Sequence, residues 1–100
     1  MLSKIHQVTQ QMGQLRKLTR QIESLEGEGA AGGGMVKVRM NGARQVRRVT
    51  IDPEAVRSGD VELLEDLVKA AVNDASRKIE QQMQERLGSL EELGQLAGGR

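Results

Sequence analysis

The spacing of apolar residues changes twice along the chain, and these changes constrain the fold more than any other feature of the sequence. Up to about residue 25, apolar residues recur at steps of three and four, which is the period of an α-helix. Residues 35–40, MVKVRM, then follow the alternation of a half-buried β-strand. Helical spacing returns from residue 64 to residue 87. This order predicts an α+β domain with a long N-terminal helix, a small antiparallel sheet and a long C-terminal helix.

The central strands are predicted to form a β-hairpin. The dipeptide Asn41-Gly42 is a strong hairpin signal, and residues 45–51 supply the return strand. We prefer a four-residue loop that begins at Asn41, because this loop sets Val36 opposite Val49. A two-residue loop would instead set Val36 opposite a basic side chain.

Two further signals concern the edge of the sheet and the helix starts. Residues 24–31 are the only candidate for a third strand, although their composition is poor for one, so we expect two or three strands. Asp52 is predicted to cap a short helical turn, because a proline follows it at the first helical position. Asp60 is predicted to cap the second long helix in the same way.

The end of the second long helix is predicted from its glycines. Gly88 is expected to interrupt the helix, because glycine is unfavourable in a helix interior and more glycines follow. We therefore expect a single domain over residues 1–88. Residues 89–100 are expected to form a flexible or frayed C-terminal tail.

Composition excludes several classes of protein. The 100 residues include no Cys, no Phe, Trp or Tyr, and one His, which rules out disulfides, cysteine nucleophiles, multi-histidine metal centres and aromatic base-stacking surfaces. No nucleophile–base pair stands at a recognisable spacing, so we expect no enzyme, no cofactor and no metal. No apolar run reaches the ~20 residues of a membrane span, and a cytoplasmic protein is the expectation. The aliphatic core is thin, which favours a homo-oligomer.

The net charge of +1 hides a strong segregation of charge along the chain. Residues 35–51 carry basic residues and no acid, whereas residues 52–66 are mainly acidic. In the preferred hairpin register Lys37 lies opposite Arg48, with Arg39 beside them on the same face, and facing like charges destabilise a sheet. A phosphate backbone would compensate these charges. The acidic segment of the same chain, or simple solvation, would do so too, and the sequence leaves these alternatives open.

A second basic group lies in the first helix. Arg16, Lys17 and Arg20 fall beside the apolar stripe, and residues 16 and 20 share a helix face. On a projecting helix, these side chains would grip a DNA duplex through its phosphates. A solvated coiled-coil flank is the alternative, and these residues alone favour it.

Several short strings, taken in order, resemble the bacterial YbaB/EbfC family: MVKV, NG, RRV, IDP, LEDLV and AAVNDA, over about residues 1–87. The resemblance implies a small nucleoid-associated protein that forms a homodimer shaped like tweezers, with long helices as arms. It implies binding to double-stranded DNA with little sequence preference, and an influence on nucleoid organisation and gene expression. It also implies a location in the cytoplasm and nucleoid, and a link to recombination or repair.

The resemblance also assigns candidate DNA-binding residues to the two arms. For the first arm these are Lys4, Arg16, Lys17 and Arg20, and for the second arm Arg77, Lys78 and Arg86. The hairpin adds Lys37, Arg39 and Arg48 as further candidates. Within AAVNDA, Asn73 and Asp74 suggest either a buried polar contact at the dimer or sheet interface or local hydrogen bonding, and we favour the local bonding.

Two functions are therefore weighed. The leading hypothesis is a dimeric, non-enzymatic protein that binds double-stranded DNA through phosphate and shape contacts. The alternative is a dimeric coiled-coil adaptor for a replication or recombination complex, in which DNA binding is incidental. The modest net charge and the acidic segment 52–66 support the alternative. The expected partners are DNA, a second copy of the chain and replication or recombination proteins, with no membrane.

Overall fold

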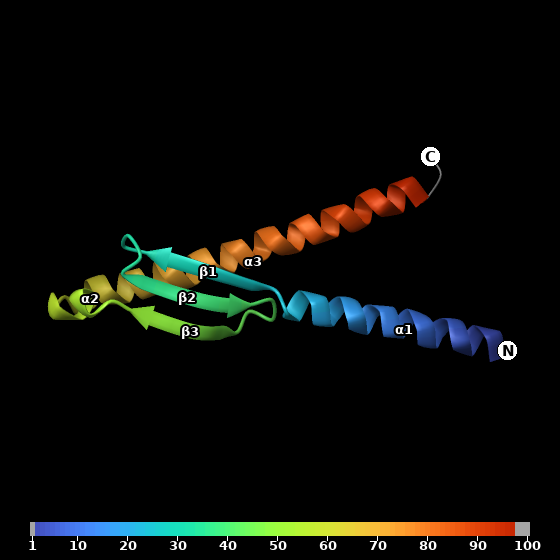
Figure 1. Ribbon diagram of the computed structural model, residues 1–100, viewed down its shortest axis with the longest axis horizontal. Coiled ribbons are helices and arrows are strands. Elements are labelled where there is room, and N and C mark those ends of the chain that lie inside the picture. Colours follow the sequence, from blue (N-terminus) through green and yellow to red (C-terminus); the bar gives the residue numbers. More distant parts are fainter. Residues whose placement is uncertain (1, 98–100) are drawn as a thin grey trace.

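The computed structural model describes the backbone of residues 2–97 and the side chains of residues 9–88. The predicted α+β order is confirmed, with a sheet of three strands in the order β1-β2-β3 (Figure 1). The elements in chain order are α1 (Leu2–Glu23), β1 (Glu26–Ala31), β2 (Val36–Asn41), β3 (Val46–Ile51), α2 (Pro53–Arg57) and α3 (Val61–Ala97). Both neighbouring strand pairs are antiparallel.

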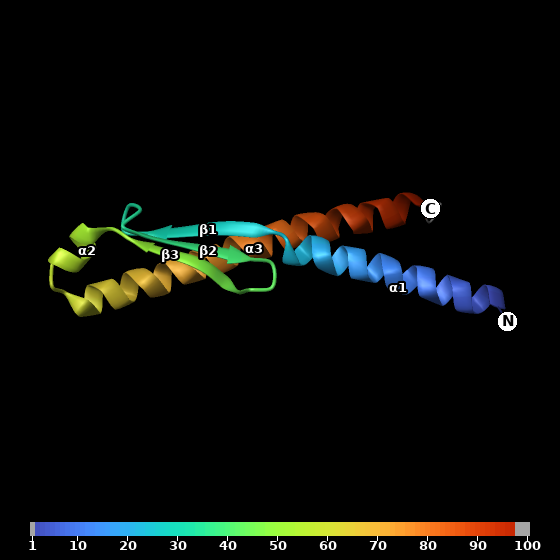
Figure 2. The ribbon, with the colours of Figure 1, turned by 60° about the horizontal axis from the view of Figure 1, so that its bottom comes forward.

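The core lies between α3 and one face of the sheet. Alternate residues of β2 point toward the helix, so Val36, Val38 and Met40 are buried. The helix supplies Ala71, Ala75 and Ile79, one turn apart, and all three are fully buried. α3 packs against β1 and β2, and none of the described helices covers the far face of the sheet (Figures 1 and 2).

The third strand is β1, which falls in the segment whose composition is poor for a strand. Its glycines have a packing reason. A Cβ on Gly29 would overlap the carbonyl oxygen of Ala71 and the backbone nitrogen of Ala75. The strand and the helix approach so closely that only glycine fits between them, and small alanines face it from α3. Glycine here marks helix–sheet contact and not a flexible connector.

The hairpin register differs from the predicted one by two residues. Val36 lies opposite Ile51 and Val38 opposite Val49, so the expected pairing of Val36 with Val49 is wrong. The loop has three residues, because the amide nitrogen of Asn41 donates to the carbonyl of Gln45 at 3.0 Å. A bulge near the loop adds the second residue of shift. The slip of two leaves residues 48–51 on their predicted face, whereas Val46, on the loop side of the bulge, is shifted by one residue and lies opposite Met40.

The helix starts follow the predicted caps, but the helix end does not. Asp52 accepts a hydrogen bond from the amide of Glu54 at 2.9 Å, and Asp60 accepts one from Leu63 at 3.0 Å. α3 then continues through Gly88 as far as Ala97, so the predicted interruption is wrong. A glycine costs a helix about 1 kcal/mol, which a helix of 37 residues absorbs without breaking.

The molecule is strongly elongated. α1 and the distal part of α3 project in roughly the same direction beyond the end of the sheet (Figures 1 and 2). The extents are 68 × 31 × 15 Å, and the radius of gyration is 19.9 Å, against about 13 Å for a compact chain of this length. The chain therefore presents two helical arms with large exposed surfaces.

Candidate nucleic-acid interface

The first candidate surface is the flank of α1. Arg16, Lys17 and Arg20 are all exposed, and none of them forms a hydrogen bond or ion pair through its side chain with another residue of the described part. They adjoin Met12 and Leu15, which are 50% and 62% exposed. α1 thus combines unpaired cations with an uncovered apolar stripe.

These side chains also shape a shallow hollow along the helix. It has a volume of about 340 Å³ and is lined by Met12, Leu15, Arg16, Thr19 and Arg20. The fourth candidate of the first arm, Lys4, lies outside the residues whose side chains are described. The flank of α1 is therefore defined here by Arg16, Lys17 and Arg20.

The second candidate surface is the face of the sheet opposite α3, which we call the open face. Lys37, Arg39, Arg48, Glu28 and Thr50 line a small hollow of about 100 Å³ there. The predicted pair of Lys37 with Arg48 is wrong, since Lys37 lies opposite Thr50. Arg39 lies directly opposite Arg48, so the structure still sets two like charges face to face.

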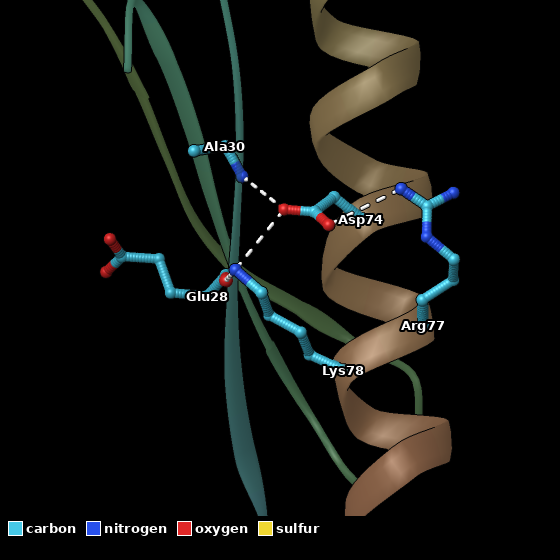
Figure 3. A network of polar contacts seen from close by, with 5 residues as sticks. All are labelled: Glu28, Ala30, Asp74, Arg77 and Lys78. Carbon is cyan, nitrogen blue, oxygen red and sulfur yellow. Dashed lines mark hydrogen bonds and ion pairs between the residues drawn. The ribbon is translucent and has the colours of Figure 1, made fainter. Parts of the chain in front are cut away.

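The basic residues of α3 have different surroundings. Lys78 donates to the carbonyl oxygen of Glu28 at 2.7 Å and lies 3.3 Å from a carboxylate oxygen of Asp74. Arg77 reaches the other oxygen of Asp74 at 3.4 Å (Figure 3). Arg86 is exposed on the projecting part of the helix. Of the three α3 candidates, Lys78 is the one most fully engaged with the protein itself.

Asp74 is the centre of this polar network. Its carboxylate accepts a hydrogen bond from the backbone amide of Ala30 at 3.0 Å, so it ties α3 to β1 (Figure 3). That hydrogen bond, followed by the one from Lys78, holds the pKa of the Asp74 carboxyl below its ordinary value. Asp74 therefore combines the two expected roles, because it bonds locally to Arg77 and Lys78 along α3 and also bonds to the sheet at Ala30. Asn73 points to solvent.

Side chains of α3 form hydrogen bonds with the backbone along the outer edge of β1. Asp74, Lys78 and Gln82, spaced one turn apart, bond to the backbone of Ala30, Glu28 and Glu26 respectively. Edge strands with free backbone groups invite pairing with other strands, and these contacts occupy that edge. The four-residue spacing of polar side chains along the predicted helix was the available sequence signal.

Arg44 is a further basic residue with a structural role. It occupies the left-handed region, with φ of 64°, at the end of the hairpin loop. Its guanidinium donates to the carbonyl of Ser76 at 3.2 Å and pairs with Glu80 at 2.8 Å. Arg44 therefore fastens the hairpin to α3, which removes it from the basic cluster of the hairpin.

Other kinds of site find no support in the described part of the chain. Among the described side chains, no group of three or more His, Asp or Glu is arranged to hold a metal ion. None of the described helices is both long and apolar enough to cross a bilayer. The exposed basic surfaces are the features that call for a partner.

Comparison with known proteins finds relatives that are named nucleoid-associated proteins. A nucleoid-associated protein of Chloroflexus aurantiacus is 47% identical over 85 residues, which cover 84% of this chain and 85% of that protein. A nucleoid-associated protein of Koribacter versatilis is 56% identical over 63 residues, covering 63% of this chain and 62% of that protein.

The fold also has a match among solved structures. The crystal structure of HP0035, an uncharacterized protein from Helicobacter pylori, superposes with a TM-score of 0.69 over 88% of this chain and 94% of that chain, at 21% identity. The model of the YbaB/EbfC DNA-binding family matches residues 1–94. The chain belongs to the YbaB/EbfC DNA-binding family.

Proposed function

We propose that this protein binds double-stranded DNA as a homodimer, mainly through phosphate and shape contacts with little sequence preference. In this role it alters DNA conformation at the nucleoid and so influences nucleoid organisation and gene expression. The observation that carries the proposal is the flank of α1, which presents Arg16, Lys17 and Arg20 to solvent without partners in the described part of the chain.

The chemistry of this flank suits phosphates better than bases. Arginine and lysine side chains neutralise phosphates and release the counterions condensed on DNA, which gives affinity without sequence information. The chain has no aromatic residue to stack on an unpaired base. Contact with the backbone, together with the shape of the duplex, is therefore the mode of binding that the residues support.

The apolar surfaces support the homodimer. Val49 and Ile51 of β3 lie opposite the buried Val38 and Val36, yet they are 46% and 37% exposed, because α3 packs against β1 and β2. An isolated helix such as α1 is also marginal in water without a packing partner. A second copy would cover these surfaces and add the core that so small a chain lacks.

The dimer has its own test. Sedimentation equilibrium of the wild type should give the mass of two chains at micromolar concentration. Val49→Asp places a charge on the exposed apolar strip of β3 and should shift the mass toward one chain. A wild-type mass of one chain at all concentrations would exclude the homodimer.

DNA binding is tested by a gel-shift titration with several unrelated duplexes at cellular ionic strength. We expect retardation of all of them at micromolar protein, with similar affinities, since non-specific binders have a Kd of roughly 10⁻⁴–10⁻⁶ M. The acidic segment 52–66 favours one other function, a dimeric adaptor for replication or recombination proteins. Absence of retardation for every duplex would reject DNA binding and favour the adaptor.

A further inference from the structure

The open face of the sheet is mainly polar. Its outward residues in the two central rows are Glu28, Ala30, Lys37, Arg39, Arg48 and Thr50. All six are exposed, and the side chain of Glu28 points away from α3 (Figure 3). None of these residues is a large apolar one, so the face lacks the core of a protein–protein interface.

The cations on this face are poorly compensated by the chain. Lys37 and Arg48 form no hydrogen bond or ion pair through their side chains with any other described residue. Arg39 has one acidic neighbour, Glu28, at 3.7 Å, which is too long for a hydrogen bond. Such an exposed pair contributes little stability. Three positive side chains therefore share this face with the weakly held carboxylate of Glu28 and with the exposed carboxylate of Glu26 in the next row, so the face keeps a net positive charge.

The acidic segment 52–66 does not compensate them either. Asp52 and Asp60 cap the starts of α2 and α3, and Glu54 pairs with Arg57. Among the described side chains, no residue of this segment forms an ion pair with the open face. Besides solvation, the sequence left two ways to compensate these cations, which are an external anion and the acidic segment. Because the acidic segment makes no ion pair with them, the geometry favours an external anion.

The arrangement of the cations fits a phosphate. Arg39 lies opposite Arg48 across the two strands, and Lys37 lies on the next row of the same face. The hollow of about 100 Å³ between them has room for a few water molecules at about 30 Å³ each. Guanidinium groups bind phosphate oxygens through paired donors. A phosphate at this point would relieve the repulsion between the two arginines.

We propose that the open face of the sheet is a second surface for the DNA phosphate backbone, distinct from the helical arms. The inference rests on the proposed DNA-binding function and adds a site to it. Lys37, Arg39 and Arg48 make the contacts, and Thr50, which lies opposite Lys37 on the same face, adjoins them. A bound duplex therefore passes close to Thr50, and it does not pass close to Asn73, on the side of α3 that faces away from the core.

The absence of cysteine makes a direct test simple, because one introduced cysteine is a unique attachment point. Three single-cysteine variants are labelled with a short photo-crosslinker and irradiated with a bound duplex. Thr50→Cys reports on the open face, and Gln21→Cys, one turn from Lys17, reports on α1. Asn73→Cys is the matched control, since its exposed side chain lies on the side of α3 away from the core residues Ala71 and Ala75.

We expect DNA adducts at positions 21 and 50 and none at position 73. Adducts at position 21 without adducts at position 50 would overturn the open-face site while DNA binding stands. Equal adducts at positions 50 and 73 would also overturn it, because the duplex would then contact the far side of α3 as readily as the open face. Failure of the wild type to retard any duplex would overturn both the site and the proposed function.

A charge-matched pair of variants provides the second test. Arg39→Gln/Arg48→Gln should weaken binding to all duplexes several-fold and lower the slope of log affinity against log salt by about 2, roughly 0.9 for each lost phosphate contact. Arg57→Gln/Lys69→Gln removes the same charge from exposed positions elsewhere and should leave the slope unchanged. Equal slopes for both double variants would overturn the proposal. Thermal melting of each variant confirms that it folds.

Discussion

The basic residues at the contact between α3 and the sheet carry the same charge as those of α1 but have different surroundings. Lys78 and Arg44 bind carbonyl and carboxylate oxygens of the protein, at 2.7 Å to Glu28 and 2.8 Å to Glu80. The cations of α1 have no such partners in the described part of the chain. A paired cation must lose its partners before it binds phosphate, whereas a solvated one loses only water and counterions. The number of positive charges therefore does not locate a DNA-binding surface. The surface is indicated by cations that have no partner within the described part of the protein.

The same contrast holds for the glycines of the two regions. A Cβ on Gly29 would overlap backbone atoms of α3, whereas a Cβ on Gly13 in α1 would meet nothing within 4 Å. The contact between α3 and β1, which we call the seam, is tightly packed, whereas α1 projects away from it. Stability should therefore respond to changes in the seam, and DNA affinity to changes on α1.

The largest effect is expected from Gly29→Ala. The added methyl group forces α3 away from β1, and the overpacking should cost about 3 kcal/mol of unfolding free energy. The measurement is urea unfolding followed by circular dichroism. Gly13→Ala is the matched control and should stabilise by up to about 1 kcal/mol, because alanine is the better helix former. Equal effects of the two variants would show that the seam is not close-packed.

A smaller loss of stability is expected when Asp74 is neutralised. Because its pKa is lowered in the folded state, Asp74 contributes stability above its ordinary pKa of about 3.8, and this contribution disappears as the pH falls through the lowered value. Asp74→Asn should therefore lower the melting temperature at pH 7 and reduce the loss on acidification. Asp66→Asn, on the exposed part of the same helix, should do neither. Identical acid profiles for wild type and Asp74→Asn would contradict the role of this carboxylate.

The smallest effects should separate Lys78 from Arg86, two cations of one helix. Lys78→Gln removes a hydrogen bond to β1 and should cost about 1 kcal/mol or less, given that the side chain is half exposed. Arg86→Gln should leave stability unchanged and weaken DNA binding slightly. Melting curves and gel shifts on both proteins check this. The reverse assignment, with Lys78 controlling affinity and Arg86 stability, would break the comparison.

Most of the fold was predictable because it depends on local signals. Apolar spacing located both long helices, and Asp52 and Asp60 marked two helix starts. The hairpin register was not predictable, because an Asn-Gly pair fits hairpin loops of more than one length, and the apolar alternation of β2 does not mark the bulge between Arg39 and Met40. The composition of β1 was misleading for another reason, since its glycines are selected by the approach of α3.

The sequence predicted the candidate site as a set of basic residues. The structure shows which of these residues contact other parts of the protein and which are exposed without such contacts. The sequence does not show that Lys78 would reach across to β1, because its partners are a backbone carbonyl about 50 residues away and Asp74. It also did not show that Arg44 would turn toward α3. The sequence shows which residues are charged, but only the fold shows which of them pair with other parts of the protein.

The central claim is that the flank of α1 contacts DNA phosphates. The most direct measurement is the salt dependence of DNA affinity for the wild type and for Arg16→Gln/Lys17→Gln/Arg20→Gln. The account predicts weaker binding to every duplex and a slope lower by about 3, at close to 0.9 for each lost phosphate contact, with the melting temperature unchanged. An unchanged slope and affinity in this folded triple variant would contradict it.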